Sequence, residues 1–459
     1  MQASPALLRS FGLRASILLI ISSIIGSGVF KKVAPMMAEL GSSGWVLAAW
    51  AVAGLVSLAG ALTVAEVAGR IAGAGGAYDY LREMYGEAVA FLYGWGCFAV
   101  IETAAVSSIA YVFAESVHAV IPLPDLLPGV LPNAGIKLVA ISLVLILMGI
   151  NIRGAGAGGW ISKATTATVV LSLMAIIVLG LTSAAGNMAH FAPESALPPA
   201  RSRFDAFFVA MLSAFWAYKG WMSLSFLGAE IKDPLRNIPR AFGLGVLAVI
   251  AIYLLVNAAY LYVLPPAALA AVHASGSQIA AIAAMEQVLG SGGRWFIAVL
   301  ILISTLGCTN ATLLMTSRIG YAMAGRKLFF PAAGRIHPRY STPAAALLMQ
   351  GGWACILILS GSFDQLTDML VFAEFIFYGL IAAGVFLLRK KHAAASAYRT
   401  PGYPLTPALF ALFCLVLVTV TLYSRPWEAL AGLGLILTGL PFYFYWKKQL
   451  NSRDSSANA

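Results

Sequence analysis

Long apolar stretches recur along the whole chain, and each can cross the hydrocarbon core of a membrane. A crossing needs about 17 to 25 helical residues. Inside a bilayer every backbone N–H and C=O group needs a partner within the protein, so only helices and closed barrels are tolerated. The chain is therefore predicted to be an all-α polytopic membrane protein. Its twelve predicted transmembrane segments are 15–36, 44–70, 86–118, 136–152, 160–182, 206–228, 239–264, 293–324, 343–361, 366–388, 406–424 and 428–446.

Composition excludes a set of soluble domains. The chain of 459 residues is 60% hydrophobic and 10% charged, with a mean hydropathy of +0.87, whereas soluble domains are about half apolar and about a quarter charged. The net charge of +11 would suggest nucleic acid as the partner of a soluble protein. Here the basic residues fall mainly in the loops on the side that also holds both termini. The positive-inside rule therefore predicts cytoplasmic termini, with the lipid bilayer as the partner and no nucleic acid.

No catalytic, cofactor-binding or metal-binding module is apparent. There is no P-loop, so transport must be driven by gradients or by exchange, and the histidines fall in loops or at segment ends without metal-ligand spacing. An enzyme, a cofactor and a metal are accordingly not expected. No loop predicted to be external contains a cysteine, which argues against a disulfide-linked ancillary subunit. All four cysteines lie in apolar segments, where small packing residues are expected: Cys97, Cys308, Cys355 and Cys414.

The first segment is interrupted by Gly26-Ser27-Gly28. Glycine leaves the helical conformation without a Cβ penalty, so the amides that follow Gly26 are expected to point into a cavity. The N-terminus of the second half-helix would bind an anion, to which Ser27 can add its hydroxyl. The carbonyls of Ile24 and Ile25 would accept hydrogen bonds from an ammonium group. This polarity suits an α-amino acid, whereas the alternative interpretation is a tight contact between helices at a small-x-small pair.

The sixth segment is interrupted by Tyr218-Lys219-Gly220-Trp221. The carbonyls of Phe215, Trp216 and Lys219 would then face the same ammonium group. The ring of Trp216 is large enough to close over a ligand as a gate, although a lone aromatic residue in a bilayer helix usually only packs. Paired interruptions in corresponding segments predict a substrate site at the middle of the membrane, so the chain is interpreted as a solute transporter.

Five motifs, in order along nearly the whole chain, resemble those of the amino acid–polyamine–organocation transporters. The similarity is strongest to the L-amino-acid transporter branch, which includes bacterial serine/threonine exchangers. The bacterial inner membrane is therefore the expected location. The motifs are Gly26-Ser27-Gly28-Val29-Phe30, Ala72-Gly73-Ala74-Gly75-Gly76-Ala77-Tyr78, Trp216-Ala217-Tyr218-Lys219-Gly220-Trp221, Gly228-Ala229-Glu230-Ile231-Lys232-Asp233-Pro234 with Pro239-Arg240-Ala241, and Arg399-Thr400-Pro401-Gly402-Tyr403-Pro404.

The resemblance implies a LeuT-like fold with two inverted five-helix repeats, 15–182 and 206–388, followed by two further helices within 406–446. It also implies that Ser27 and Gly28 hold the substrate carboxylate, while carbonyls of Ile24, Trp216 and Lys219 hold the amine. Transport would follow alternating access.

One departure from the branch concerns the fifth segment. Many members place a lysine there, packed against the break of the first segment, whereas alignment puts Val169 at that position. The nearest lysine, Lys163, is expected near the cytoplasmic face. A sodium ion is one possible substitute, held by carbonyls of the first segment and by hydroxyls of the eighth: Ser304, Thr305 or Thr309.

Glu102, Lys219 and Glu374 lie deep in predicted segments. Each would cost several kcal/mol if it were left charged in lipid, so each should face a cavity or a partner. The resemblance places all three at the side-chain end of the substrate pocket. An ion pair of Lys219 with Glu102 or Glu374 is one interpretation. The remaining carboxylate would be protonated and serve proton coupling, or contact a polar or cationic substrate side chain.

These observations favour an exchanger or a proton-coupled permease for neutral or polar L-amino acids. A cationic amino acid transporter is the alternative within the same class. A sensor with a transporter fold, which binds an amino acid without moving it, is the alternative from another class, because its binding residues would be the same.

Overall fold

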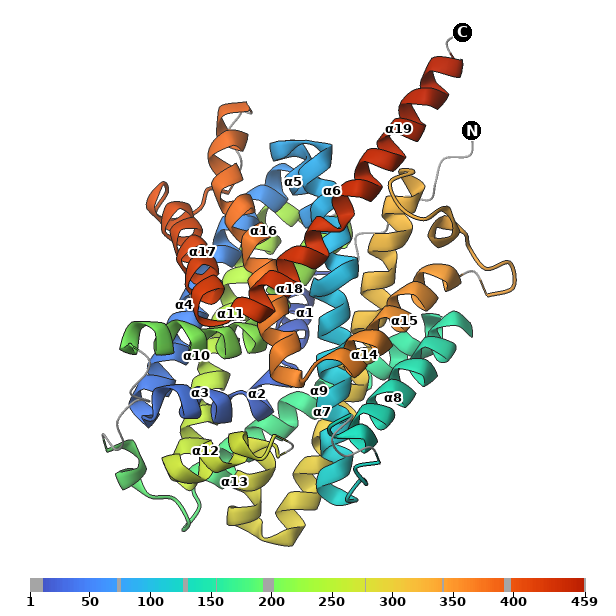
Figure 1. Ribbon diagram of the computed structural model, residues 1–459. Coiled ribbons are helices and arrows are strands. Elements are labelled where there is room, and N and C mark those ends of the chain that lie inside the picture. Colours follow the sequence, from blue (N-terminus) through green and yellow to red (C-terminus); the bar gives the residue numbers. More distant parts are fainter. Residues whose placement is uncertain are drawn as a thin grey trace.

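The computed structural model describes residues 11–71, 76–126, 131–153, 155–192, 202–276, 278–340, 342–391 and 398–457. Within these ranges the chain is helical and forms no strand, as expected; one isolated β-bridge joins Phe11 and Ile231. Eight of the described helices are long and apolar enough to cross a membrane, and four shorter helices are also apolar. The chain is therefore a polytopic membrane protein (Figure 1).

The elements follow one another in a single helical bundle. The first half of the chain contains α1 (Leu13–Ile24), α2 (Gly28–Lys31), α3 (Val33–Leu40), α4 (Ser43–Arg70), α5 (Ala77–Tyr85), α6 (Glu87–Gly96), the π-helical turn η1 (Cys97–Ile101), α7 (Glu102–Val120), α8 (Ala134–Arg153), α9 (Ala155–Leu181) and η2 (Met188–Phe191). The second half contains α10 (Arg203–Tyr218), η3 (Trp221–Glu230), α11 (Pro234–Val263), α12 (Pro266–Ala274), α13 (Ala280–Leu289), α14 (Ser291–Gly325), η4 (Pro331–Gly334), α15 (Ala344–Ser360), α16 (Phe363–Lys391), α17 (Leu405–Ser424), α18 (Pro426–Leu437) and α19 (Gly439–Ala457).

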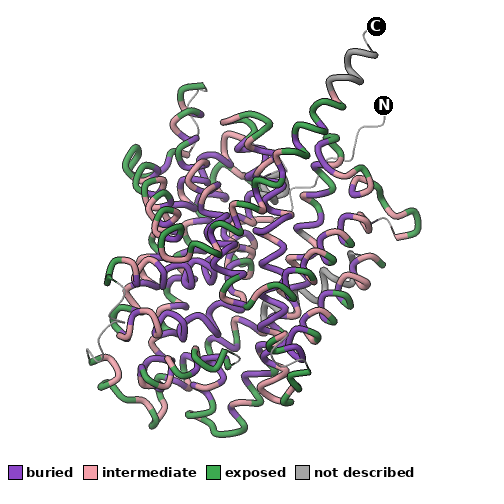
Figure 2. The backbone as a smooth tube through the Cα atoms, in the orientation of Figure 1, coloured by how far each residue is buried: buried purple, intermediate pink, exposed green. Residues whose placement is uncertain are grey.

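Burial separates central helices from peripheral ones. In the stretch Glu87–Val120 the most apolar window is 83% buried, whereas in α17 it is 28% buried. Figure 2 shows the buried backbone along the middle of the bundle and exposed positions around it. Exposed leucines such as Leu409, Leu412 and Leu415 form the outer surface of α17. Apolar side chains on this surface suit contact with lipid tails.

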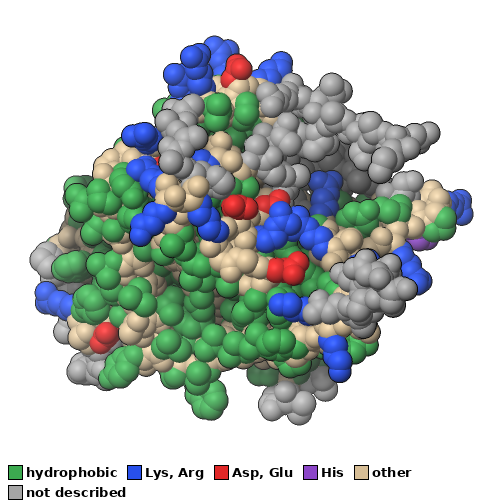
Figure 3. Space-filling model, turned by 90° about the horizontal axis from the view of Figure 1, so that it is seen from above, with side chains coloured by type: hydrophobic (Ala, Val, Ile, Leu, Met, Phe, Trp, Pro, Cys, Tyr) green, Lys and Arg blue, Asp and Glu red, His purple; other side chains and the backbone are tan. Residues whose placement is uncertain are grey.

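Both termini lie at one end of the bundle, and α12 and α13 lie at the other (Figure 1). Seen from the end that holds the termini, the surface carries many lysine and arginine side chains (Figure 3). Loops and helix ends in this region supply exposed basic residues that include Lys327, Arg335, Lys390, Lys391, Lys447 and Lys448.

One local expectation was wrong. The seventh predicted segment was expected to start at residue 239, but α11 starts earlier, at Pro234, and continues without a break to Val263. Asp233 occupies the N-cap position, yet its side chain makes no capping hydrogen bond. Pro239 lies in the second turn of α11, where its missing N–H disturbs the hydrogen-bond ladder less than at the centre of the helix.

Candidate functional site

The two predicted interruptions are present, and they contact each other. The first apolar segment is divided between α1 and α2, and the sixth between α10 and η3. A β-carbon on Gly28 would lie 2.6 Å from the Cα of Ala217 and 3.0 Å from Cδ1 of Trp216. A β-carbon on Gly220 would collide with the backbone carbonyl of Ser23. Glycine at 28 and 220 therefore allows the two broken helices to approach closely.

At the first break the chain leaves the helical conformation at Ile25 (φ −72°, ψ 101°) and α2 begins three residues later. The Ile25 amide still donates to the carbonyl of Ile21 at 2.9 Å. The hydroxyl of Ser27 is buried and has no hydrogen-bond partner among the described residues. Because most buried polar atoms are paired, this hydroxyl at the start of α2 is a candidate donor to a ligand or a water molecule.

A tyrosine of α11 joins the two breaks. The Tyr253 hydroxyl lies 3.1 Å from the carbonyl oxygen of Ile24 and 2.9 Å from that of Ala217, so its one proton is shared between them. Each carbonyl oxygen has two lone pairs. The Ile24 carbonyl, expected to be free for an ammonium group, thus already accepts one hydrogen bond. Tyr253 was not predicted from the sequence, because a single tyrosine in an apolar helix looks like a packing residue.

At the second break α10 ends at Tyr218 and the backbone turns at Gly220, whose φ is 113°. This φ lies in the left-handed region, which favours glycine. The Trp216 carbonyl accepts a hydrogen bond from the Lys219 amide at 3.3 Å. The indole N–H of Trp216 is buried without a partner among the described residues. Trp216 packs edge to face against Phe363, with ring centroids 6.1 Å apart.

Phe215, the neighbour of Trp216, makes a different contact. Its ring is buried and lies 4.5 Å, centroid to centroid, from the ring of Phe375 in α16. The Phe215 side chain therefore anchors α10 on α16, and its backbone carbonyl remains the part of Phe215 expected to face a ligand.

The three deep ionisable residues come together as one cluster. The Lys219 ammonium lies 2.9 Å from Oε1 of Glu102 and 2.8 Å from Oε1 of Glu374. The three side chains are 13%, 21% and 9% exposed in the order Lys219, Glu102, Glu374. One lysine thus contacts both carboxylates, whereas the sequence analysis expected a pair with either one. If both carboxylates are ionised, the cluster carries one net negative charge beside the second break.

Two lysines that follow the first break form ion pairs with distant helices. Lys31 pairs with Glu115 of α7, and the fully buried Lys32 lies 2.6 Å from Asp364 of α16. Both ammonium groups lie over the ring of Phe363, at 4.4 and 4.5 Å from its centroid. Since Phe363 also contacts Trp216, its ring connects this ion-pair cluster to the second break.

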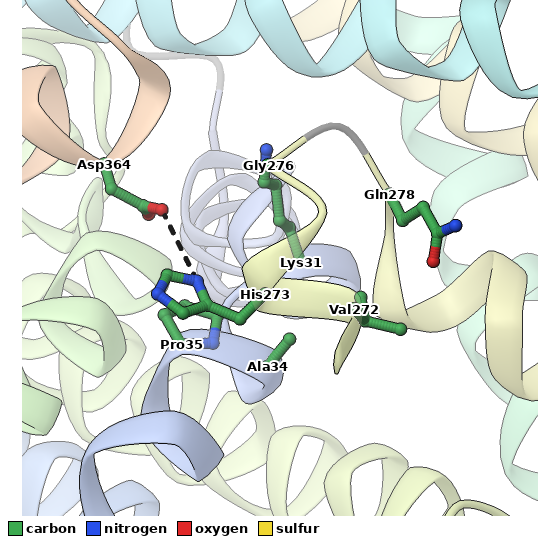
Figure 4. Close-up of a pocket in the computed structure, with 8 residues that line it drawn as sticks. All are labelled: Lys31, Ala34, Pro35, Val272, His273, Gly276, Gln278 and Asp364. Atoms are coloured by element: carbon green, nitrogen blue, oxygen red, sulfur yellow. Dashed lines mark ion pairs between the residues drawn. The ribbon is translucent and has the colours of Figure 1, made fainter. Parts of the chain in front are cut away.

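Next to these ion pairs is a small hollow lined by residues of α2, α3, α12 and the start of α16. Figure 4 shows Lys31, His273 and Asp364 around it, with His273 Nδ1 3.9 Å from an Asp364 carboxylate oxygen. The roles of Lys31, Lys32, Glu115 and Asp364 were not predicted from the sequence. Their positions near segment ends concealed their burial.

A second group of charged side chains surrounds a buried carboxylate of α4. Glu66 of α4 is fully buried and pairs with Arg70, 3.0 Å away. It also accepts hydrogen bonds from Arg389 at 2.6 and 2.7 Å and from the Thr400 amide at 2.8 Å. The guanidinium of Arg389 stacks on Tyr403 at 3.4 Å. The motif at 399–404 therefore serves to attach the connection after α16 to α4.

The position expected for a lysine in the fifth segment is filled by Val169, which is buried. The Sγ atom of Cys308 in α14 lies 4.0 Å from the Ile25 carbonyl, and a β-carbon on Gly26 would lie 3.8 Å from the same sulfur. The hydroxyls of Thr305 and Thr309 bond to carbonyls within α14. Lys163 and the residues 72–75 of the glycine-rich motif lie outside the side chains and residues that the structure describes.

Comparison with known proteins agrees with this architecture. Residues 11–435 match the family model of amino acid permeases. The serine/threonine exchanger SteT of Bacillus subtilis (strain 168) is 33% identical over 444 residues, which cover 96% of this chain and 97% of that protein. The human b(0,+)-type amino acid transporter 1 is 30% identical over 96% of this chain and 88% of its own length. The human large neutral amino acids transporter small subunit 2 is 29% identical over 96% of this chain and 82% of its own length.

These relatives are transporters rather than enzymes, and they resemble this chain over nearly all of its length. The matched range, residues 11–435, spans both broken segments. The chain belongs to the amino acid permease family of the amino acid–polyamine–organocation superfamily, whose members carry amino acids across membranes.

Proposed function

We propose that this protein is a secondary active transporter that exchanges neutral or polar L-amino acids by alternating access. The observation that carries the proposal is the meeting of the two breaks. The unpartnered Ser27 hydroxyl and Trp216 indole lie there, and Lys219 with its two carboxylates lies beside them. Exchange is the proposed mode because one similar relative is named a serine/threonine exchanger.

The α-carboxylate of the substrate would bind at the start of α2. The amides of Ser27 and Gly28 lie at a helix N-terminus, where the backbone favours an anion, and the buried Ser27 hydroxyl supplies a further donor. Gly26 and Gly28 keep this region free of β-carbons, so a carboxylate can approach the backbone.

The α-ammonium group would bind carbonyl oxygens from both breaks. Ile25 follows α1 in an extended conformation, Trp216 lies in the last turn of α10, and Lys219 directly follows α10. The Ile24 carbonyl contributes its second lone pair, since Tyr253 uses the first. Trp216 would act as the gate, because it lies at the second break and its ring packs against Phe363.

Lys219, Glu102 and Glu374 would contact or neutralise the substrate side chain. With both carboxylates ionised, the cluster has one net negative charge, so an anionic side chain is disfavoured. Lys219 opposes a long cationic side chain. Neutral or polar amino acids remain, with serine and threonine as the first candidates. A proton on Glu102 or Glu374 would provide coupling in a symport cycle.

The proposed topology has twelve spans, with 15–182 and 206–388 as inverted repeats and two further helices within 406–446. Both termini would face the cytoplasm of a bacterial cell, the protein being in the inner membrane. The basic side chains at the end that holds the termini support this orientation (Figure 3). No disulfide-linked ancillary subunit is proposed.

Uptake of labelled L-serine and L-threonine into proteoliposomes tests the proposal. Vesicles preloaded with unlabelled amino acids should accumulate label, and empty vesicles should not. Uptake into empty vesicles that depends on a pH gradient and disappears in Glu102→Gln or Glu374→Gln would replace exchange by proton symport. Binding of the same amino acids without any flux would favour the sensor.

A further inference from the structure

The helix that carries Glu102 contains an irregular turn directly before it. Residues Cys97–Ile101 form a π-helical turn, and the amide of Glu102 donates to the carbonyl of Cys97, five residues earlier. An α-helix would use the carbonyl four residues earlier. A π-turn places one additional residue in the helix, and such turns are frequent at functional sites.

The additional residue changes the direction in which Glu102 points. Each residue of an α-helix advances the side-chain direction by about 100°. If the turn relaxed to α-helix, Glu102 would rotate by about that angle relative to α6. Glu102 would then lose its 2.9 Å contact with Lys219, provided that α6 kept its place. The π-turn therefore sets the position of this carboxylate.

Side chains of α15 bind the backbone of this turn. The indole N–H of Trp353 donates to the carbonyl of Ala99 at 2.7 Å. The Thr103 hydroxyl donates to the carbonyl of Phe98, and it accepts a hydrogen bond from the amide of the buried Gln350 at 2.9 Å. Within a membrane a backbone carbonyl displaced from its ladder needs such a partner.

These contacts belong to a regular seam between α7 and α15. Thr103 faces Gln350, and one turn later Ser107 donates to the carbonyl of Ala354 at 3.0 Å. A further turn on, the Tyr111 hydroxyl lies 3.1 Å from the carbonyl of Ile358. All three pairs are separated by 247 positions in the chain, so the two helices run parallel in a fixed register. The contacts between α7 and α15 therefore extend for two helical turns beyond the π-helical turn.

We infer that Thr103, Gln350 and Trp353 are positioning residues for Glu102 and determine which substrate side chains are accepted. Neither Gln350 nor Trp353 belongs to the two breaks or to the charged cluster. Both act through the π-turn. The inference rests on the proposed function, because it gives Glu102 its role at the substrate side chain.

A second set of contacts is made by a residue just before the π-helical turn. Trp95, two residues before it, donates its indole N–H to the Leu435 carbonyl at 3.2 Å and to the Thr438 hydroxyl at 3.0 Å. It also stacks on Phe442 with centroids 4.7 Å apart. Trp95→Phe removes an indole donor from the same segment without touching the seam, which makes it the matched control for Trp353→Phe.

The experiment places a reporter at position 102. The variant Glu102→Cys is reacted with a small water-soluble thiol reagent, and the rate is corrected for the four native cysteines with the parent protein. Thr103→Val and Trp353→Phe, each combined with Glu102→Cys, should change the rate about five-fold, the factor for one net hydrogen bond. Thr103→Ser, which keeps the hydroxyl, and Trp95→Phe should leave the rate within about two-fold.

Transport selectivity supplies the second readout. In the protein with Glu102 intact, Thr103→Val and Trp353→Phe should change the ratio of KM values for threonine and a larger neutral amino acid in the same direction as Glu102→Gln. In the Glu102→Gln background they should add nothing to that ratio. A merely structural role would lower the maximal rate and leave the ratio unchanged.

Unchanged labelling rates in both Thr103→Val and Trp353→Phe would overturn the inference, as would equal changes in the Trp95→Phe control. Changed labelling in a protein that transports no amino acid would contradict the proposed function while leaving the positioning of residue 102 established. The two failures are therefore distinguishable.

Discussion

Ser27, Lys219 and Tyr253 illustrate what single residues disclose from sequence and what they conceal. A serine between two glycines and a lysine in the middle of an apolar segment contradict the chemistry of a lipid environment, so both stand out in the amino-acid sequence alone. Tyr253 does not contradict it, and only the fold shows its hydroxyl between the Ile24 and Ala217 carbonyls. Residues that violate a local rule can be predicted, whereas those that obey it and act over a distance cannot.

Removing the hydroxyl of Tyr253 should loosen the two breaks. Tyr253→Phe loses the donor shared by two buried carbonyls, so we expect about 1 to 2 kcal/mol lower stability of the folded state and a several-fold higher KM. Thermal unfolding and uptake kinetics measure these effects. Tyr260→Phe is the control, because the Tyr260 hydroxyl on the same helix is buried without a partner among the described residues. Equal effects of the two substitutions would contradict the bridging role.

Replacing Lys219 alone should lower the stability of the folded protein more than replacing Lys219, Glu102 and Glu374 together. Lys219→Gln leaves two buried carboxylates 2.9 and 2.8 Å from where the ammonium was, and breaking a buried ion pair costs about 3 to 5 kcal/mol. The triple variant Lys219→Gln, Glu102→Gln, Glu374→Gln carries no such charge and should regain much of the lost thermal stability. It should not regain wild-type substrate preference. A triple variant less stable than Lys219→Gln would refute this account of the cluster.

At the scale of helices, hydropathy and glycine positions predicted apolar helices and two interruptions, and the structure shows these interruptions between α1 and α2 and between α10 and η3. The π-turn Cys97–Ile101 was missed, because nothing in an apolar run with few glycines distinguishes it from α-helix. The start of α11 was also misjudged, since a proline after an aspartate is compatible with either a short or a long helix. Helix continuity depends on tertiary contacts that a local pattern does not contain.

The ion pairs after the first break should control access to it. We predict that Lys32→Gln increases the labelling rate of Ser27→Cys by a membrane-impermeant thiol reagent by about ten-fold, because losing the buried pair with Asp364 weakens closure. The reagent is added on the side opposite the termini. Lys448→Gln, at an exposed position near the C-terminus, should leave the rate unchanged. No increase in the Lys32→Gln protein would show that these pairs do not close that end.

At the scale of the whole molecule, composition and hydropathy sufficed to predict a polytopic helical membrane protein, and the family match confirms an amino acid permease. The ion pairs of Lys32 with Asp364 and of Glu66 with Arg389 could not be predicted from the sequence. The partners in each pair are separated by more than 300 positions. Charge bias alone predicted the orientation, and the basic end in Figure 3 is consistent with it.

The orientation makes a prediction for intact cells. A small epitope tag after residue 459 should be cleaved by protease only after the cells are opened, because the C-terminus is expected in the cytoplasm. A tag in the loop around Gly276, at the opposite end of the bundle, is the matched control and should be cleaved in intact cells. The reverse result would invert the proposed topology.

The central claim is that an amino acid binds where the two breaks meet, and equilibrium binding of labelled L-serine or L-threonine to the purified protein tests it most directly. Ser27→Ala should weaken binding about ten-fold to a hundred-fold, the effect of losing one hydrogen bond to a charged carboxylate. The control is Ser22→Ala, because the Ser22 hydroxyl bonds to the Leu19 carbonyl one turn earlier. This variant should bind the amino acid as the wild type does. Equal affinity of the Ser27→Ala and wild-type proteins would contradict the assignment of the substrate to the breaks.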